Sequence, residues 1–197
     1  MIPDWEYQTD EVAVVPYVSG AANFPDGILG HLYLRTKEDG LLETVWAGLP
    51  GIQFDSFISQ LSSNKVVLQI YYAFDPPLTP VGYCFLYQVD GEPSQRLAQF
   101  GFCVFKNFWA KKQTRDCIWL CLAYWFEVMM VDILYGATEA DNYLARNFSR
   151  HFGFKELCVA PKFLRSANGR KDGCIVFLEK ERFLPLLEEW RKRNILA

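Results

Sequence analysis

The order of hydrophobic and polar residues changes its period several times along the chain. Apolar side chains recur at helical spacing over residues 50–62, which predicts an amphipathic helix. Three runs rich in aromatic and β-branched residues follow, at 65–74, 81–89 and 96–105, separated by the turn-forming stretches "DPPLTP" and "DGEPSQ". These runs predict an antiparallel meander of three strands.

The second half of the chain alternates between the two periods. Residues 113–130 contain no Gly or Pro and carry an apolar stripe, so they predict a helix that packs on the meander. Further elements follow in order: a strand at 132–138, a helix at 140–151, strands at 155–164 and 173–183, and an amphipathic helix at 185–194. Residues 11–43 combine short apolar stretches with turn signals and predict no definite element. The fold class is therefore α+β, with a mixed central sheet and flanking helices.

Composition limits the chain to one sizeable core. It has 197 residues, of which 51% are apolar and 16% aromatic, so residues 1–197 are expected to form a single domain. A formal charge of −3 excludes a globally basic nucleic-acid-binding protein. The longest apolar run is interrupted by Glu127, and no secretory signal opens the chain. We expect a soluble, cytoplasmic protein that binds neither nucleic acid nor membrane.

The cysteines give no sign of a metal site. All six stand among apolar neighbours, with no C-x-x-C pair and no nearby pair of histidines: Cys84, Cys103, Cys117, Cys121, Cys158 and Cys174. We therefore expect buried free thiols, in preference to a zinc site or a disulfide framework.

The stretch "GATEADNYLARNFSRHFGFKEL" has a distinctive spacing. Asn142 is followed three residues on by the small residue Ala145, seven on by Ser149, and then by the stop Gly153–Phe154. These offsets and the element order resemble the GNAT acetyltransferase superfamily over residues 50–183, with a divergent segment at 1–49. The resemblance implies a GNAT-like fold in which the strands at 96–105 and 132–138 are parallel and splay apart. It also implies acetyl-CoA as the co-substrate, with Asn142 facing it.

The pyrophosphate loop of that family departs from the expected pattern here. The family has Arg or Gln followed three and five residues later by glycine, and the resemblance places this loop at Lys111, Lys112, Gln113, Thr114, Arg115 and Asp116. Thr114 and Asp116 fill the two glycine positions. A non-glycine residue with positive φ costs about 1–2 kcal/mol, and Asp116 would repel a phosphate. The helix dipole and three cations favour binding. Alternatively, Thr114 or Asp116 caps a structural helix and the lysines are solvated.

The resemblance also names groups for chemistry. The thioester carbonyl would be polarised by backbone N–H groups of Phe102, Cys103 or Val104. Ser149 occupies the place of the family's proton-donating tyrosine and is a much weaker acid. Tyr143 and Tyr135 lie nearby in the sequence, although an aromatic residue at the helical spacing of Tyr143 is more typical of a core. A base would be expected on the sheet, where the fourth strand offers only Gln99.

Three functions remain open at this stage. The first is a GNAT-type N-acetyltransferase that transfers an acetyl group from acetyl-CoA to an unknown amine and that could form a homodimer. The second is a catalytically weakened or inactive GNAT-fold protein with a binding or structural role, such as a phage-related protein. The third is a partner-binding domain that docks another chain through its aromatic N-terminal segment and its C-terminal helix.

Overall fold

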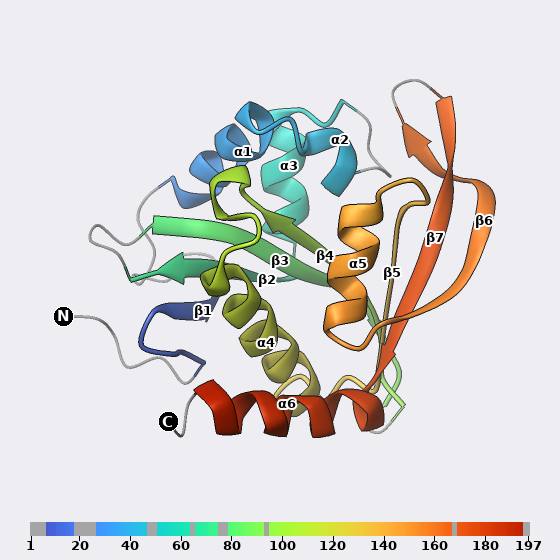
Figure 1. Cartoon of the computed structure of the whole chain (residues 1–197). Helices are drawn as coiled ribbons and strands as arrows, with labels where there is room; N and C mark the ends of the chain where they lie inside the picture. The colour runs from blue at the N-terminus through green and yellow to red at the C-terminus, as the bar shows by residue number, and fades with distance from the viewer. Residues whose placement is uncertain are drawn as a thin grey trace.

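A computed structural model describes residues 7–17, 27–46, 51–63, 66–74, 79–92, 95–166 and 169–194. In these residues one sheet of seven strands has the order β1-β2-β3-β4-β5-β7-β6 (Figure 1). The strands are β1 Val12–Pro16, β2 Val66–Ala73, β3 Thr79–Asp90, β4 Leu97–Val104, β5 Ile133–Glu139, β6 Lys155–Ser166 and β7 Gly169–Glu179. The helices are α1 Ile28–Glu38, α2 Leu42–Val45, α3 Phe54–Leu61, α4 Lys112–Glu127, α5 Tyr143–His151 and α6 Lys180–Asn194, with a 3-10 turn at Lys106–Phe108.

Helices cover both faces of the first half of the sheet. Side chains of β2 alternate between two cores: Ile70 packs with α1, α2 and α3, whereas Tyr71 packs with α4 and α6. A strand covered on both faces needs apolar residues at nearly every position. This explains why the β2 sequence is a continuous apolar run. Figure 1 shows α4 crossing one face of the sheet, with α5 beside β5 and α6 below them.

The parallel pair is present and splays as expected. β4 and β5 pair only at Leu97↔Ile133, Ala98↔Leu134 and Gln99↔Tyr135, although β4 continues to Val104 and β5 to Glu139. Every other strand pairing is antiparallel. The predicted divergence of these strands beyond their first residues, with the long helix connecting them, is confirmed.

The structure corrects three expectations, which concern the end of a strand, an unpredicted helix and the burial of one cysteine. The strand expected to reach residue 183 ends at Glu179, because the buried stripe of α6 already begins at Phe183 and continues through Leu187 and Trp190. α1 was not predicted, since its sequence follows a turn signal and contains Gly30. The cysteines are free, as expected, but Cys158 is exposed because it lies on the edge strand β6.

Two features are absent from the described residues. These residues contain no cluster of three or more His, Cys, Asp or Glu side chains that could hold a metal ion. Within the same residues, no helix is both long and apolar enough to cross a membrane.

Candidate functional site

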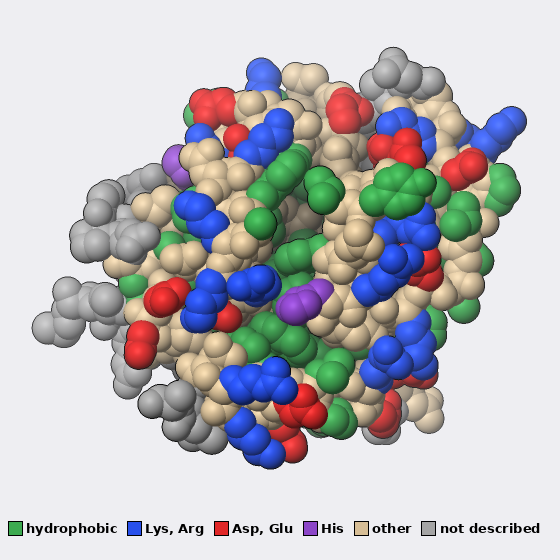
Figure 2. All heavy atoms as spheres, viewed as in Figure 1, with side chains coloured by type: hydrophobic (Ala, Val, Ile, Leu, Met, Phe, Trp, Pro, Cys, Tyr) green, Lys and Arg blue, Asp and Glu red, His purple; other side chains and the backbone are tan. Residues whose placement is uncertain are grey.

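A cleft opens where β4 and β5 part. Figure 2 shows a hollow between α4 and α5, with hydrophobic side chains in its walls and Lys and Arg side chains around it. The Phe100 ring reaches across towards β5, where it lies 3.0 Å from the position that a Cβ of Gly136 would occupy. Phe102 stacks on Trp125 of α4 with ring centroids 5.4 Å apart. The cleft therefore has aromatic walls, and Gly136 provides the space for one of them.

The N-terminus of α4 lies at this cleft and is open. Lys111 is the N-cap residue with extended backbone (φ −76°, ψ 154°), and its side chain makes no capping hydrogen bond. The first N–H groups of a helix have no partner within the helix, and the dipole of the 16-residue α4 adds partial positive charge there. Backbone donors and a positive end together favour a phosphate or another anion.

The predicted cations at this terminus are not equivalent. Lys112 Nζ donates to Asp116 Oδ2 at 2.6 Å and lies 3.7 Å from Glu11 Oε2. The hydrogen bond to Asp116 raises the pKa of Lys112, so the ammonium stays charged while its charge is compensated within the protein. Lys111 lies over the Phe108 ring, and Arg115 is exposed with no ion pair to any described residue. Two of the three cations therefore remain for a ligand.

Neither Thr114 nor Asp116 behaves as the sequence suggested. Both belong to α4, neither has a positive φ, and neither caps the helix. Thr114 Oγ1 donates to the Phe108 carbonyl at 2.5 Å, and Asp116 is buried against Lys112. The expected backbone strain lies instead at Ala110, whose φ is 61°, just before the helix. Alanine gives no sequence signal for a left-handed residue, so this position was missed.

The polar candidates on α5 interact mainly with their own helix. Asn142 Oδ1 accepts from the Ala145 backbone N–H at 3.1 Å, which makes Asn142 the N-cap. Ser149 Oγ donates to the Ala145 carbonyl at 2.9 Å. Tyr143 is 68% exposed, so the expectation that it belongs to a core is wrong. The Ala145 carbonyl thus accepts a hydrogen bond from Ser149, and the Ala145 N–H donates one to Asn142.

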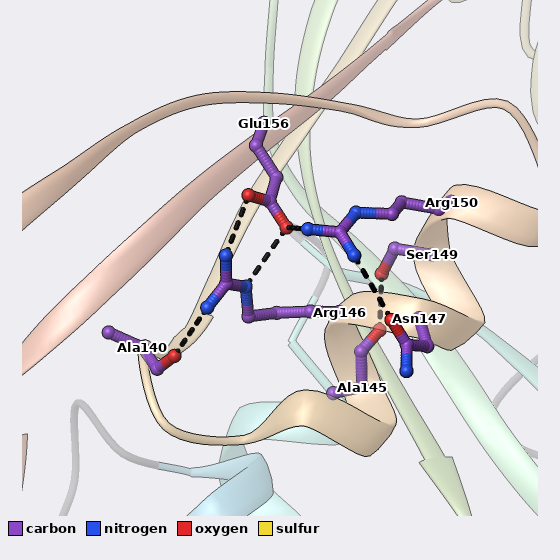
Figure 3. Close-up of polar contacts among 7 residues, drawn as sticks. All are labelled: Ala140, Ala145, Arg146, Asn147, Ser149, Arg150 and Glu156. Atoms are coloured by element: carbon purple, nitrogen blue, oxygen red, sulfur yellow. Dashed lines mark hydrogen bonds and ion pairs between the residues drawn. The ribbon is translucent and has the colours of Figure 1, made fainter.

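An ion-pair cluster fixes α5 to β6 (Figure 3). Arg146 binds Glu156 with two hydrogen bonds of 2.9 and 2.8 Å and also donates to the Ala140 carbonyl at 2.7 Å. Arg150 donates to the same carboxylate at 2.7 Å. Because the bidentate geometry defines orientation as well as distance, this cluster holds one wall of the cleft in place.

The β4 segment proposed to polarise a carbonyl borders the cleft. Beyond Gln99, β4 pairs with β3 but no longer with β5, so its β5-facing edge has no strand partner among the described residues. Within this segment the Cys103 side chain points away from the cleft, into the core below α1. Burial raises the pKa of the Cys103 thiol to about 12, which excludes it as a nucleophile near neutral pH.

Comparisons with known proteins agree with this geometry. Residues 53–155, more than half of the chain, match the family model for the acetyltransferase (GNAT) domain. No curated protein matches the sequence significantly. The solved structures that match include a spermidine N-acetyltransferase from Vibrio cholerae in complex with CoA and spermine (TM-score 0.71, 15% identity, 88% of this chain and 98% of that chain).

Two further similar structures come from other bacteria. One is a GNAT-family acetyltransferase from Bacillus anthracis, with TM-score 0.68, 12% identity, and 89% of this chain and 98% of that chain covered. The other is RimJ from Mycobacterium smegmatis in complex with CoA-disulfide, with TM-score 0.69, 14% identity, and 88% and 84% covered. At these identities the structures establish a shared fold.

Proposed function

Because the chain belongs to the GNAT acetyltransferase family, we propose that it transfers an acetyl group from acetyl-CoA to an amine. The observation that carries this proposal is the cleft between the diverging strands β4 and β5, with the uncapped N-terminus of α4 beside it. A long thioester with an anionic end fits this combination. Its phosphates would meet the helix N-terminus and its acyl end would meet the strands.

The chain's own residues suggest a division of tasks. The first N–H groups of α4, with Lys111 and Arg115, would hold the pyrophosphate. Backbone N–H groups of the residues 102–104, on the open edge of β4, would orient the thioester and polarise its carbonyl. The bound coenzyme would supply the activated acetyl group. Arg146 and Glu156 would keep α5 fixed on β6, so that this wall of the cleft stays in place.

A second candidate function is binding of the coenzyme without efficient transfer. Ser149 Oγ is directed to the Ala145 carbonyl, and the charge of Lys112 is compensated by Asp116. These contacts leave a weaker acid than the family's tyrosine and one fewer free cation than the three that this sequence offers. Binding and turnover therefore need separate measurements.

The experiment measures binding first. Titration calorimetry with acetyl-CoA should give saturable binding, and acetyl-CoA should raise the melting temperature as expected from RT ln(1 + [L]/Kd). Lys111→Ala and Arg115→Ala should each weaken binding threefold or more, whereas Lys37→Ala, an exposed lysine on α1, should not change it. No binding to the wild-type protein at millimolar acetyl-CoA would contradict the proposal.

Turnover is then measured by release of CoA thiol in the presence of amines. Spermidine is the first acceptor to test, because a similar structure is a spermidine N-acetyltransferase. A short alkylamine and a peptide with a free N-terminus complete the panel. Binding of acetyl-CoA without CoA release for any amine would favour the second candidate.

A further inference from the structure

The linker between β4 and α4, residues 105–111, joins the two parts of the proposed coenzyme site. It follows the open edge of β4 and leads directly to the N-terminus of α4. Three side-chain hydrogen bonds hold it: Trp109 Nε1 donates to the Val104 carbonyl at 2.8 Å, Thr114 Oγ1 to the Phe108 carbonyl at 2.5 Å, and the Lys106 backbone N–H to Asp39 Oδ2 at 2.7 Å. The third of these bonds attaches the linker to α1, 67 residues earlier in the chain.

Asp39 owes its position to the way in which α1 ends. Gly40 has a φ of 66°, its N–H donates to the Lys37 carbonyl at 3.0 Å, and the Leu41 N–H donates to the Thr36 carbonyl at 2.9 Å. These two bonds form a Schellman motif, for which glycine supplies the left-handed residue. Asp39 is therefore the C-cap residue of α1, and its carboxylate reaches the linker.

The end of α1 is an unfavourable place for a carboxylate. The C-terminus of a helix carries partial negative charge, so a second negative charge is disfavoured there. Asp39 is also buried, with 8% of the residue exposed. Two contacts compensate its charge: the hydrogen bond from the Lys106 N–H, and the Arg35 guanidinium 3.8 Å from Oδ1. The shorter of these contacts is the one to the linker.

The same turn of α1 contacts the end of β4 at two more points. The Arg35 guanidinium lies over the Phe105 ring at 5.6 Å, and Thr36 Oγ1 lies 3.9 Å from Cys103 Sγ. α1 lies outside residues 53–155, which match the acetyltransferase domain. An element outside the matched domain thus supports the end of β4.

The backbone direction at the end of β4 connects this support to the cleft. The Phe105 N–H donates to the Val81 carbonyl of β3 at 3.0 Å. Because backbone groups alternate along a strand, the N–H and carbonyl of Val104 face the edge that β5 has left. The Trp109 indole binds that carbonyl. Lys106 follows two residues later, so its bond to Asp39 fixes the direction in which the chain leaves the open edge.

We propose that Asp39 is a positioning residue for the coenzyme, because its bond to the Lys106 N–H fixes the end of β4 and the start of α4 relative to each other. This inference rests on the proposed acetyl transfer. Asp39 acts through the linker and not by contact with the coenzyme, since its carboxylate is buried against the Lys106 N–H. Without Asp39 the linker keeps its two internal bonds but loses its attachment to α1. Coenzyme binding then includes the cost of ordering the linker.

Titration calorimetry with CoA tests the proposal. Asp39→Ala removes the acceptor and leaves the Lys106 N–H without its partner, so the Kd for CoA should rise at least fivefold. Asp39→Asn keeps an acceptor oxygen in the same place and should bind CoA within twofold of the wild type. Where turnover is measurable, Asp39→Ala should raise KM for acetyl-CoA at least fivefold and lower kcat less than twofold.

Two controls separate positioning from a general loss of stability. Thr36→Val removes a buried hydroxyl in the same turn of α1, which donates to the Leu32 carbonyl at 2.6 Å. It should lower the melting temperature and leave the Kd for CoA within twofold. Hydrogen exchange measured by NMR follows the bond itself: the Lys106 amide should exchange at least tenfold faster in Asp39→Ala, but not in Asp39→Asn or Thr36→Val.

Lys106→Pro removes the same hydrogen bond from the other side. Lys106 is the first residue of the 3-10 turn and follows Phe105, whose backbone is extended, so proline fits there. Lys106→Gln keeps the N–H and controls for the lost charge. Lys106→Pro should bind CoA at least threefold more weakly than Lys106→Gln, and adding Asp39→Ala to it should change the Kd less than twofold. If Asp39→Ala does not fold, the comparison of Lys106→Pro with Lys106→Gln decides the question.

Four results would overturn the role of Asp39. They are CoA binding by folded Asp39→Ala within twofold of the wild type, equal weakening by Asp39→Asn and Asp39→Ala, equal weakening by Thr36→Val and Asp39→Ala, and equal affinity of Lys106→Pro and Lys106→Gln. Each of them leaves the proposed function intact. Failure of the wild-type protein to bind CoA would instead contradict the proposed function, and the role of Asp39 with it, so the two failures are distinguishable.

Discussion

Lys112 and Asp116 form an ion pair one helical turn apart at the start of α4, with Lys112 Nζ 2.6 Å from Asp116 Oδ2. The carboxylate is buried, whereas half of the lysine side chain is exposed. Lys112, the first residue of α4, therefore has its charge compensated within the protein. In the proposed coenzyme site, Arg115 and Lys111 carry the larger share of the interaction with phosphate.

Removing the carboxylate should release that charge. Asp116→Asn is expected to tighten acetyl-CoA binding by about two- to fivefold, because an ion pair of a partly exposed lysine is worth about 1 kcal/mol or less. Lys112→Ala should change the affinity less than threefold, and less than Arg115→Ala does. Calorimetric titration of the three variants checks the order. An Asp116→Asn protein that folds but binds acetyl-CoA more weakly would show that Lys112 does not face the ligand.

Ala110 should be replaceable by glycine with a gain in stability. Its φ of 61° is unfavourable for a residue with a Cβ, and relief of this strain is worth about 1–2 kcal/mol. Ala110→Gly is therefore expected to raise the free energy of unfolding by roughly 0.5–1 kcal/mol, after subtraction of the glycine's larger entropy in the unfolded chain. Urea denaturation measures the change.

The matched control is the same substitution in a regular helix. Ala145 lies inside α5, so Ala145→Gly should lower the free energy of unfolding by about 1 kcal/mol. Opposite signs for the two substitutions would establish the strain at Ala110. A loss of stability in both variants would mean that the loop before α4 adopts another conformation.

The Arg146–Glu156 cluster should make stability depend on pH in the acidic range. Its hydrogen bond to Arg146, followed by the charges of Arg146 and Arg150, lowers the pKa of Glu156 below its usual value of 4.5. A carboxylate with a lowered folded-state pKa stabilises the protein above its unfolded pKa. That contribution disappears as the pH falls through the lower, folded-state value.

Glu156→Gln should therefore lose stability at pH 6–7 and show a flatter decline in melting temperature below about pH 4.5. The effect should be modest, since the pair is close to solvent, where ion pairs contribute little to stability. Glu189→Gln removes one partner of an exposed pair on α6 and serves as the control. If the melting temperatures of the wild type and Glu156→Gln fell identically with pH, the cluster would make no contribution to the pH dependence of stability.

The limits of prediction differ between the fold and the site. The meander β2 to β4 could be predicted, because each strand contains an apolar, β-branched and aromatic run. Gly153, with φ of 90°, ends α5 as its sequence predicts. The helix starts at Tyr143 and not at residue 140, because Asn142 is its N-cap. α1 could not be predicted, because its buried face becomes recognisable only when packed against β1 and β2.

The site depends on features that no local pattern reveals. The spacing of Lys112 and Asp116 was compatible with an ion pair. Burial of Asp116 follows from packing of the whole α4 helix. The sequence therefore indicates the family and the place of the cleft, whereas the assignment of charges requires the three-dimensional arrangement.

Ser149 provides the most direct test of whether α5 contributes an acid. Its hydroxyl proton is donated to the Ala145 carbonyl at 2.9 Å, so it is not directed at a ligand, and a serine without an adjacent base is a poor acid at neutral pH. Ser149→Ala should lower the turnover number less than tenfold, measured as CoA release with the best acceptor. Ser149→Tyr should leave turnover unchanged or raise it, since a phenol is the stronger acid. General acid catalysis typically contributes about 10²- to 10⁴-fold. A loss of a hundredfold in Ser149→Ala, with acetyl-CoA affinity intact, would therefore show that the hydroxyl leaves the Ala145 carbonyl during the reaction and protonates the leaving thiolate.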